Sequence, residues 1–358
     1  MKKRIIVIAL LLFVIVVLVV VVLWYFMGNP LYQPGMLQSG RHLRASLTPP
    51  AQKGQADFWD IEKDVQLHHF TDGNGKKVLV IHGGPGYPFT QPLAGLKPLA
   101  DRYQFVYYDQ RGCGKSTRPF DRFSSSNYFK NMTKLERTLG LGAQVADIER
   151  IRQLLGEEKL TLIGHSFGAF LAALYAAEFP ERVNGLVLVS PANVLVMPAE
   201  GGGLYAQLSP LLPDSLKQEY NEFLAGYFDF RKIFTKSETD LAALNQRFAR
   251  FYATAVQQKN PAAAEAMAII DNGGWMVFAM YFSMGKRHDY RAALKVVSAP
   301  VLVIHGANDL QSEQESRIYA EAFPNAGFSI IANTGHFSFE EQPVAFAITV
   351  SQFLDGLK

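Results

Sequence analysis

The segment that most constrains the fold of this chain is residues 160–169. A short apolar run over residues 160–163 leads into the pentapeptide GHSFG at residues 164–168, with Ser166 at its centre. This order predicts a buried strand, a sharp turn that carries the serine at its tip, and a helix that begins directly afterwards. The glycines on either side permit the close backbone approach that such a turn needs. The alternative without a catalytic role is a tight turn with a solvated serine.

Similar apolar runs recur along the chain and alternate with helix-like segments. Runs that are apolar throughout fit strands buried on both faces of a parallel sheet. The expected strands are a hairpin at residues 58–62 and 65–70, then residues 77–81, 105–108, 160–163, 186–189, 301–304 and 328–331. Helices are expected at residues 143–155 and 169–178. Alternation of this kind implies right-handed crossovers and a mostly parallel sheet, so the fold class is α/β.

Two later loops supply a carboxylate and an imidazole. Asp309 follows the strand expected at residues 301–304, and His336 follows the strand expected at residues 328–331. A serine hydroxyl is a weak nucleophile until a base removes its proton, and a carboxylate can hold that base in the correct tautomer. The chain order Ser166, Asp309, His336 goes with a serine on a strand-to-helix turn. We therefore predict that these three residues form a catalytic triad.

Other polar residues are weaker candidates for the triad. His305 lies at a strand end and is expected to be structural, and His165 is expected to point away from the reacting centre. Asp271 and Asp289 fall inside a helical insertion and are poorer acids. Cys113 has no histidine near it in sequence, so we interpret it as a small residue packed near the site.

The motif HGGPG at residues 82–86 directly follows the strand expected at residues 77–81. An oxyanion needs at least two preorganised donors, and backbone N–H groups beside glycines can reach it unhindered. We assign one donor to Gly84, with Gly83 as the near alternative, and the other to Phe167, the residue after the nucleophile. The alternative interpretation is a flexible loop.

A third motif, DQRGCG at residues 109–114, also follows a strand. It indicates a turn held by Asp109 and Arg111, and it lacks the spacing of a phosphate-binding loop. Together with residues 82–86, it resembles the prolyl iminopeptidase family of α/β-hydrolase peptidases, which remove N-terminal proline.

This resemblance covers about residues 59–193 and 300–358. It implies an α/β-hydrolase fold with an eight-stranded, mostly parallel sheet and a helical cap between strands six and seven. It also carries over Ser166, Asp309 and His336 as the triad, and the oxyanion loop at Gly83 and Gly84.

The chain departs from the family pattern in two places. The family's nucleophile turn usually has the sequence glycine-glycine-serine-tryptophan-glycine, whereas residues 164–168 have the form commoner among esterases. The family also uses cap carboxylates to hold the free amino group of its substrate. The candidates for that role here are Glu200, Asp214, Glu219, Glu222, Asp229, Glu238 and Asp240, and no spacing selects among them.

Ser166 excludes chemistries that need a carboxylate at this turn, such as epoxide or haloalkane hydrolysis. What remains is acyl transfer to water through an acyl-enzyme. The resemblance implies an aminopeptidase that acts on a short peptide or another small molecule. A hydrolase of small or lipophilic carboxylic esters and a carbon–carbon bond hydrolase stay open, as does a non-catalytic binding protein on the same scaffold.

Composition narrows the range of partners and cofactors. The formal net charge is +3, and Lys2, Lys3 and Arg4 account for it, so the remainder is neutral. A neutral body offers no electrostatic footprint for nucleic acid. One cysteine rules out an internal disulfide, and no residues have metal-ligand spacing, so we expect no metal or organic cofactor. The oligomeric state is left open.

Residues 5–27 form an uncharged, almost wholly apolar run behind a cationic start. About 20 apolar residues span a bilayer as a helix, and flanking cations stay on the cytoplasmic side. The alternative is a cleaved signal peptide, whose apolar region is usually about 7–15 residues. We predict an uncleaved, single-pass anchor in the lipid bilayer, with the catalytic domain extracytoplasmic (periplasmic or extracellular).

The remaining boundaries follow from composition. After the anchor at residues 1–27, the prolines and glycines of residues 28–55 predict a linker or a strap over the catalytic domain. Residues 56–195 and 296–358 form the two parts of the catalytic core. Residues 196–295 have helical periodicity with many aromatics, which predicts a helical cap, although an aromatic stripe is more often core than ligand site.

Overall fold

The computed structural model describes residues 13–18, 28–260 and 271–357, and we call the last two ranges the body. Most of the predicted membrane anchor, residues 5–27, lies outside the described residues. Within the described ranges, no helix combines the length and the apolar character that crossing a bilayer requires.

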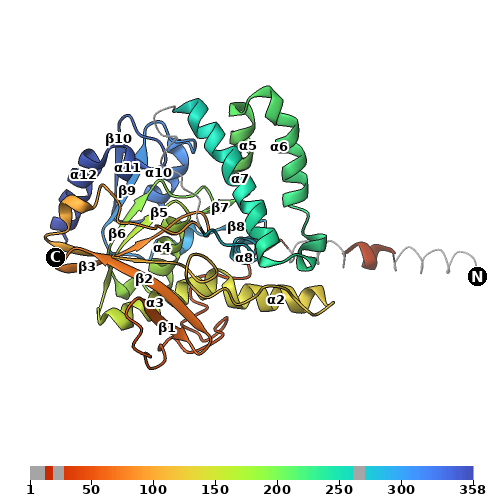
Figure 1. Cartoon of the computed structure of the whole chain (residues 1–358), viewed down its shortest axis with the longest axis horizontal. Helices are drawn as coiled ribbons and strands as arrows, with labels where there is room; N and C mark the ends of the chain where they lie inside the picture. The colour runs from red at the N-terminus through yellow and green to blue at the C-terminus, as the bar shows by residue number, and fades with distance from the viewer. Residues whose placement is uncertain (1–12, 19–27, 261–270, 358) are drawn as a thin grey trace, which may run out of the picture.

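An eight-stranded sheet forms the centre of the body (Figure 1), with the strand order β1-β2-β4-β3-β5-β6-β9-β10. β2 pairs antiparallel with β1 and β4, and all other neighbours are parallel. Every predicted apolar run lies within one of these strands, which confirms the mostly parallel sheet. The strands are β1 Phe58–Glu62, β2 Val65–Asp72, β3 Lys76–Ile81, β4 Tyr103–Tyr108, β5 Leu160–His165, β6 Val183–Val189, β9 Val301–Gly306 and β10 Ala326–Ile331.

Helices bury both faces of this sheet. On β3, Val78 and Val80 belong to one hydrophobic cluster, whereas Leu79 and Ile81 belong to the other. This alternation explains why a strand buried on both sides is apolar throughout. The helices of the core are α2 Tyr128–Leu139, α3 Leu141–Leu155, α4 Phe167–Glu178, α10 Glu313–Ala322, α11 Ser338–Glu341 and α12 Pro343–Asp355, with short turns η1 Lys97–Leu99 and η2 Pro180–Arg182. The two predicted helices lie within α3 and α4.

A helical cap follows the sixth strand of the sheet and precedes the seventh (Figure 1), as the resemblance implied. Several of its aromatics are buried and pack on one another, including Tyr220, Phe223 and Phe251. The elements between β6 and β9 are β7 Val196–Met197, η3 Glu200–Gly202, α5 Gly203–Leu208, η4 Ser209–Leu211, α6 Asp214–Tyr227, η5 Phe230–Thr235, α7 Glu238–Lys259, α8 Trp275–Met284, β8 His288–Asp289 and α9 Arg291–Leu294.

Residues 28–55 contain no helix or strand and pack against the rest of the body as a strap. The buried carboxylate of Glu178, at the end of α4, accepts hydrogen bonds from the Tyr32 hydroxyl at 2.8 Å and from the Gly35 backbone N–H at 2.7 Å. It also accepts the backbone N–H groups of Leu37 and Gln38. Of the two predicted alternatives, a linker or a strap, the structure has the strap.

Candidate active site

Ser166 occupies the sharp turn between β5 and α4. Its φ of +54° and ψ of −118° form a backbone conformation that L-residues rarely adopt. A Cβ atom on Gly164 would lie 2.5 Å from the Gly168 carbonyl oxygen, and one on Gly168 would lie 2.2 Å from the Ile81 carbonyl oxygen. Glycine is therefore required at both positions, and the surrounding backbone holds the strained serine in place.

His336 and Asp309 are joined by a hydrogen bond of 2.9 Å between Nδ1 and Oδ2, and both are buried. They meet because β9 and β10 are parallel neighbours whose carboxyl ends lie side by side. Burial raises the pKa of Asp309, but the attraction and hydrogen bond of His336 outweigh it, so the net pKa lies below the ordinary value. Asp309 is therefore ionised at neutral pH, which favours the His336 tautomer with its proton on Nδ1.

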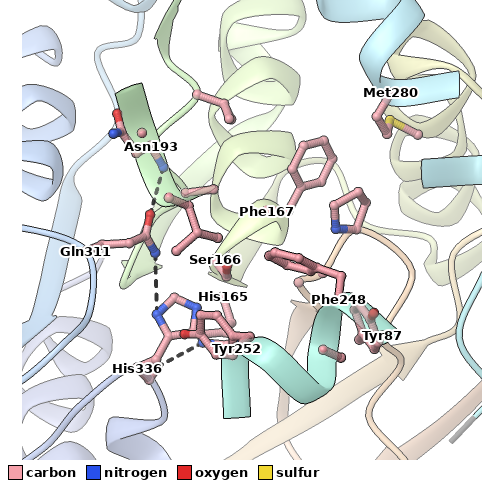
Figure 2. Close-up of a pocket in the computed structure, with 18 of the residues that line it drawn as sticks. Tyr87, His165, Ser166, Phe167, Asn193, Phe248, Tyr252, Met280, Gln311 and His336 are labelled. Atoms are coloured by element: carbon pink, nitrogen blue, oxygen red, sulfur yellow. Dashed lines mark hydrogen bonds between the residues drawn. The ribbon is translucent and has the colours of Figure 1, made fainter. Parts of the chain in front are cut away.

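Ser166, His336 and the predicted oxyanion residues line one pocket (Figure 2). Gly83 packs directly on the serine, because a Cβ atom there would lie 2.8 Å from Ser166 Cβ. Among the described residues, the backbone N–H groups of Gly83, Gly84 and Phe167 have no hydrogen-bond partner. The structure therefore brings together all six predicted site residues, with Asp309 behind His336 and unpaired backbone N–H groups in the same pocket wall as the serine.

Gln311 holds the acid and lies beside the base. Its backbone N–H donates to Asp309 Oδ1 at 3.1 Å, and its side-chain Nε2 lies 3.4 Å from His336 Nδ1. Its Oε1 accepts the backbone N–H of Asn193 at 2.8 Å, and the Asn193 side chain donates to Glu315 (Figure 2 shows the first of these two bonds). Sequence analysis missed Gln311, although its position two residues after the acid could have drawn attention to it.

His165 lines the pocket rather than pointing away from it, so that prediction was wrong. Its Nε2 donates to the His336 carbonyl oxygen at 2.9 Å, and the two ring centroids are 4.7 Å apart. His165 is the last residue of β5, directly before Ser166, whose positive φ turns the chain. Burial and then the nearby His336 lower the pKa of His165 to about 3. A neutral His165 therefore holds the backbone of the base.

The pocket is a mainly apolar cavity of about 510 Å³ between the sheet edge and the cap. Figure 2 shows Phe167, Phe248 and Met280 on one side of Ser166, with His336 and Gln311 on the other. Among the described residues, Glu340 is the one carboxylate in the wall. The large apolar side chains that line the pocket are Phe89, Leu93, Phe167, Val194, Met197, Leu204, Phe248, Met280, Met284, Phe337 and Phe339.

Tyr252, on α7, contributes a hydroxyl that sequence analysis did not single out. Its ring centroid lies 6.1 Å from that of His336, and its buried hydroxyl has no hydrogen-bond partner among the described residues. Burial raises the pKa of Tyr252 well above its ordinary value, so the hydroxyl stays protonated and can donate. A buried, unpaired hydroxyl is costly, and a bound substrate oxygen can satisfy it. Nothing in the sequence separates Tyr252 from the cap aromatics that form core.

The seven cap carboxylates that were candidates for an amino-group site do not line this pocket. Glu238 instead accepts the backbone N–H groups of Gly274 and Trp275 and pairs with Arg118 at 2.7 Å. The remaining six are Glu200, Asp214, Glu219, Glu222, Asp229 and Asp240. The part of the chain that the structure describes therefore places no cap carboxylate at the reacting centre.

The third sequence motif, residues 109–114, has a structural role next to the site. Arg111 is fully buried and pairs with Asp147 at 2.5 Å and with Glu62 at 3.0 Å, which ties this turn to α3 and β1. His305 bonds Ser316 at 3.0 Å, as expected for a structural residue. Cys113 is buried, and burial raises the pKa of its thiol. In the described ranges, no group of three or more His, Cys, Asp or Glu side chains could hold a metal ion.

Comparison with known proteins agrees with this geometry. The model of the α/β hydrolase fold family matches residues 76–343. The chain therefore belongs to the α/β-hydrolase family, and it is a hydrolase. Within that family it stands close to the proline iminopeptidases: the one from Heyndrickxia coagulans is 27% identical over 294 residues, which cover 80% of this chain and 93% of the relative.

Solved structures show the same fold at lower identity. An esterase from Thermogutta terrifontis has a TM-score of 0.55 and 21% identity, and the match covers 86% of this chain and 96% of the esterase. Proline iminopeptidase from Mycobacterium smegmatis has a TM-score of 0.52 and 19% identity, with 82% and 95% covered. At these identities the two structures support the fold and leave the choice of substrate to the site.

Proposed function

We propose that this protein is a membrane-anchored serine hydrolase that forms an acyl-enzyme on Ser166 and acts on carboxylic esters with apolar acyl groups. The pocket carries this proposal. Its wall is mainly apolar, and its single described carboxylate is Glu340. Burying an apolar acyl chain in such a cavity gains about 25 cal/mol per Å² of surface, whereas a charged group would lose its hydration there.

The arrangement suits a two-step acyl transfer. His336 Nε2 takes the proton of the Ser166 hydroxyl as its oxygen bonds to the ester carbonyl carbon, and Asp309 stabilises the imidazolium. The N–H groups of Gly84 and Phe167 hold the oxyanion. His336 then returns the proton to the departing alkoxide, so an alcohol leaves and the acyl-enzyme remains. Water repeats the sequence, which releases the acid and restores the serine.

Membrane attachment and location are part of the same proposal. The support is the apolar run at residues 5–27 behind Lys2, Lys3 and Arg4. This charge order favours an extracytoplasmic body. Protease added outside intact cells, after the outer membrane has been made permeable where there is one, should degrade the body. Complete protection of the body would contradict this orientation.

A second candidate is an aminopeptidase of the proline iminopeptidase type. The H. coagulans relative carries that name and matches four-fifths of this chain. Glu340 is the one pocket-lining carboxylate of the described residues that could pair with a substrate ammonium group, and its Oε1 accepts the Ala94 backbone N–H at 3.1 Å. Within the described residues, this activity would therefore depend on Glu340 and not on a cap carboxylate.

Substrates of the two kinds separate these candidates. Full-length protein in detergent micelles should hydrolyse p-nitrophenyl esters with a KM that falls as the acyl chain lengthens, and Glu340→Gln should leave this unchanged. Turnover of proline β-naphthylamide, with a KM that rises in Glu340→Gln but not in the exposed control Glu313→Gln, would select the aminopeptidase. If neither substrate turns over and a fluorophosphonate does not label Ser166, the protein is not a serine hydrolase.

A further inference from the structure

The strap joins the body directly where the apolar segment of the sequence ends. The Gly28 carbonyl oxygen accepts the backbone N–H groups of Lys286 at 2.8 Å and Arg287 at 2.9 Å, and the Leu31 N–H donates to the Ser283 carbonyl oxygen at 2.8 Å. Gly28 is therefore bound directly to the rest of the body, with no free linker after it. An anchor that ends at residue 27 holds the face around Gly28 against the bilayer.

The same junction forms part of the pocket wall. Met284 and Gly285, at the end of α8, both line the pocket. Gly285 also touches the strap, because a Cβ atom there would lie 2.5 Å from the Asn29 carbonyl oxygen and 2.8 Å from that of Gly28. One segment of backbone thus separates the strap from the cavity, so the pocket lies close to the face that the anchor holds down.

Ring contacts connect two of the exposed aromatic side chains of the body to this junction, and a third follows one of them in sequence. In residues 28–260 and 271–357 they are Tyr128, Phe129 and Phe228, and Phe129 is 71% exposed. The Tyr128 ring lies 6.4 Å from that of Phe282, which stands on α8 just before the junction. The Phe228 ring lies 6.3 Å from that of Phe230, and the Phe230 ring lies 5.4 Å from that of Phe282. Figure 1 shows α2, which begins with Tyr128 and Phe129, extending past the sheet below the cap.

Exposed cations accompany these aromatics in sequence. Lys130 follows Phe129, Lys232 lies on η5 between two aromatics, and Lys286 follows the pocket residue Gly285. Aromatic rings with neighbouring lysines are typical of protein surfaces at the lipid headgroup level. We call Tyr128, Phe129 and Phe228 with these three lysines the aromatic face.

We infer that the aromatic face rests in the headgroup region of the membrane and that the pocket takes its substrate, a lipophilic carboxylic ester, from the bilayer. This inference rests on the proposed function for the substrate and on the anchor for the orientation. It gives a reason for an apolar cavity behind the one surface of the body where exposed aromatics gather.

An environment-sensitive dye tests the orientation without any use of activity. Phe129→Cys and, as a matched control, Val344→Cys are labelled with a nitrobenzoxadiazole thiol reagent in the full-length protein. Val344 is 70% exposed on α12, and the native Cys113 is buried. In phosphatidylcholine–phosphatidylglycerol vesicles, the dye at position 129 should shift to the blue and be quenched by brominated lipids, whereas the dye at position 344 should resemble that in water. Equal spectra at the two positions would overturn the inference.

Activity then tests the delivery of the substrate. In the same vesicles, Phe129→Asp should lower turnover of membrane-dissolved p-nitrophenyl palmitate by about tenfold and leave water-soluble p-nitrophenyl acetate unchanged. Val344→Asp should change neither. Equal loss in both variants, or no loss in Phe129→Asp, would refute delivery from the bilayer. Absence of turnover of both esters in the wild type would instead refute the proposed function, and the dye result would stand on its own.

Discussion

The sheet edge and the cap form the two walls of one pocket, yet they are encoded differently. At the sheet edge, each functional residue follows a strand within a few positions, and the parallel strands bring them together. In the cap, the pocket residues come from separate elements (Leu204 from α5, Phe248 and Tyr252 from α7, Met280 and Met284 from α8). Local backbone geometry therefore determines the chemistry, while tertiary packing of helices determines what can bind.

The largest expected effect is at the nucleophile. Ser166→Ala should lower kcat for p-nitrophenyl esters by about 10⁶-fold, because no other group can form the acyl-enzyme. Ser338→Ala is the matched control: this serine is also buried, and it lies two residues after His336. Initial rates at saturating ester measure the change. A Ser166→Ala enzyme within tenfold of the wild type would mean that the sheet edge does not carry the chemistry.

The acid at the same edge comes next. Asp309→Asn should lower kcat by about 10⁴-fold, because the neutral amide no longer selects the His336 tautomer. The native pKa of Asp309 lies below its ordinary value, so its ionised form stabilises the fold above the unfolded pKa of about 3.9, and this contribution is lost as the pH falls through the native pKa. The stability deficit of the variant, measured by urea unfolding, should therefore shrink on acidification. A deficit that grows toward low pH would contradict this assignment.

The turn geometry has a smaller, structural effect. Gly168→Ala should lower the free energy of unfolding by about 3 kcal/mol, because its Cβ would lie 2.2 Å from the Ile81 carbonyl oxygen. Gly327→Ala is the control, since its Cβ would meet its nearest neighbour at 3.9 Å. Denaturant unfolding of both variants measures the difference. Equal stability would show that the close approach at the turn is not required.

The smallest effect tests the cap. Tyr252→Phe should lower kcat/KM by about tenfold and leave stability unchanged, since the deleted hydroxyl has no partner in the described protein. Tyr220 does not line the pocket, and Tyr220→Phe removes a hydroxyl that donates to the Tyr205 carbonyl oxygen at 2.9 Å. This control should lose stability and keep its rate. The reverse pattern would assign Tyr252 a packing role alone.

The contrast between the two regions also explains what the sequence could predict. Strand periodicity and glycine spacing are local patterns. The strands of the sheet, the turn at Ser166, and the loops that carry Asp309 and His336 were therefore each identified from a short stretch of sequence. The direction of His165 was missed because its partner, the His336 backbone, comes from a loop 171 positions away in the chain.

The cap and the strap were predicted as segments, but the contacts that they make were beyond local rules. Tyr220 on α6 and Tyr252 on α7 are the same residue type in similar helical patterns. Only the packing of the helices makes Tyr252 a pocket residue and Tyr220 a core residue. Glu178 binds strap residues that are more than 140 positions away in the chain, so no local pattern could predict this contact. Long-range contacts of this kind depend on the whole fold and cannot be inferred from composition.

Mass spectrometry of the acid-quenched reaction tests the central claim most directly. Full-length protein mixed with p-nitrophenyl octanoate should release a burst of p-nitrophenol close to one equivalent per protein. The peptide that contains Ser166 should then carry one octanoyl group, and this mass should be absent from Ser166→Ala. Steady hydrolysis without a burst and without acylation of that peptide would contradict the proposed acyl-enzyme, as would an octanoyl group that persists in the variant.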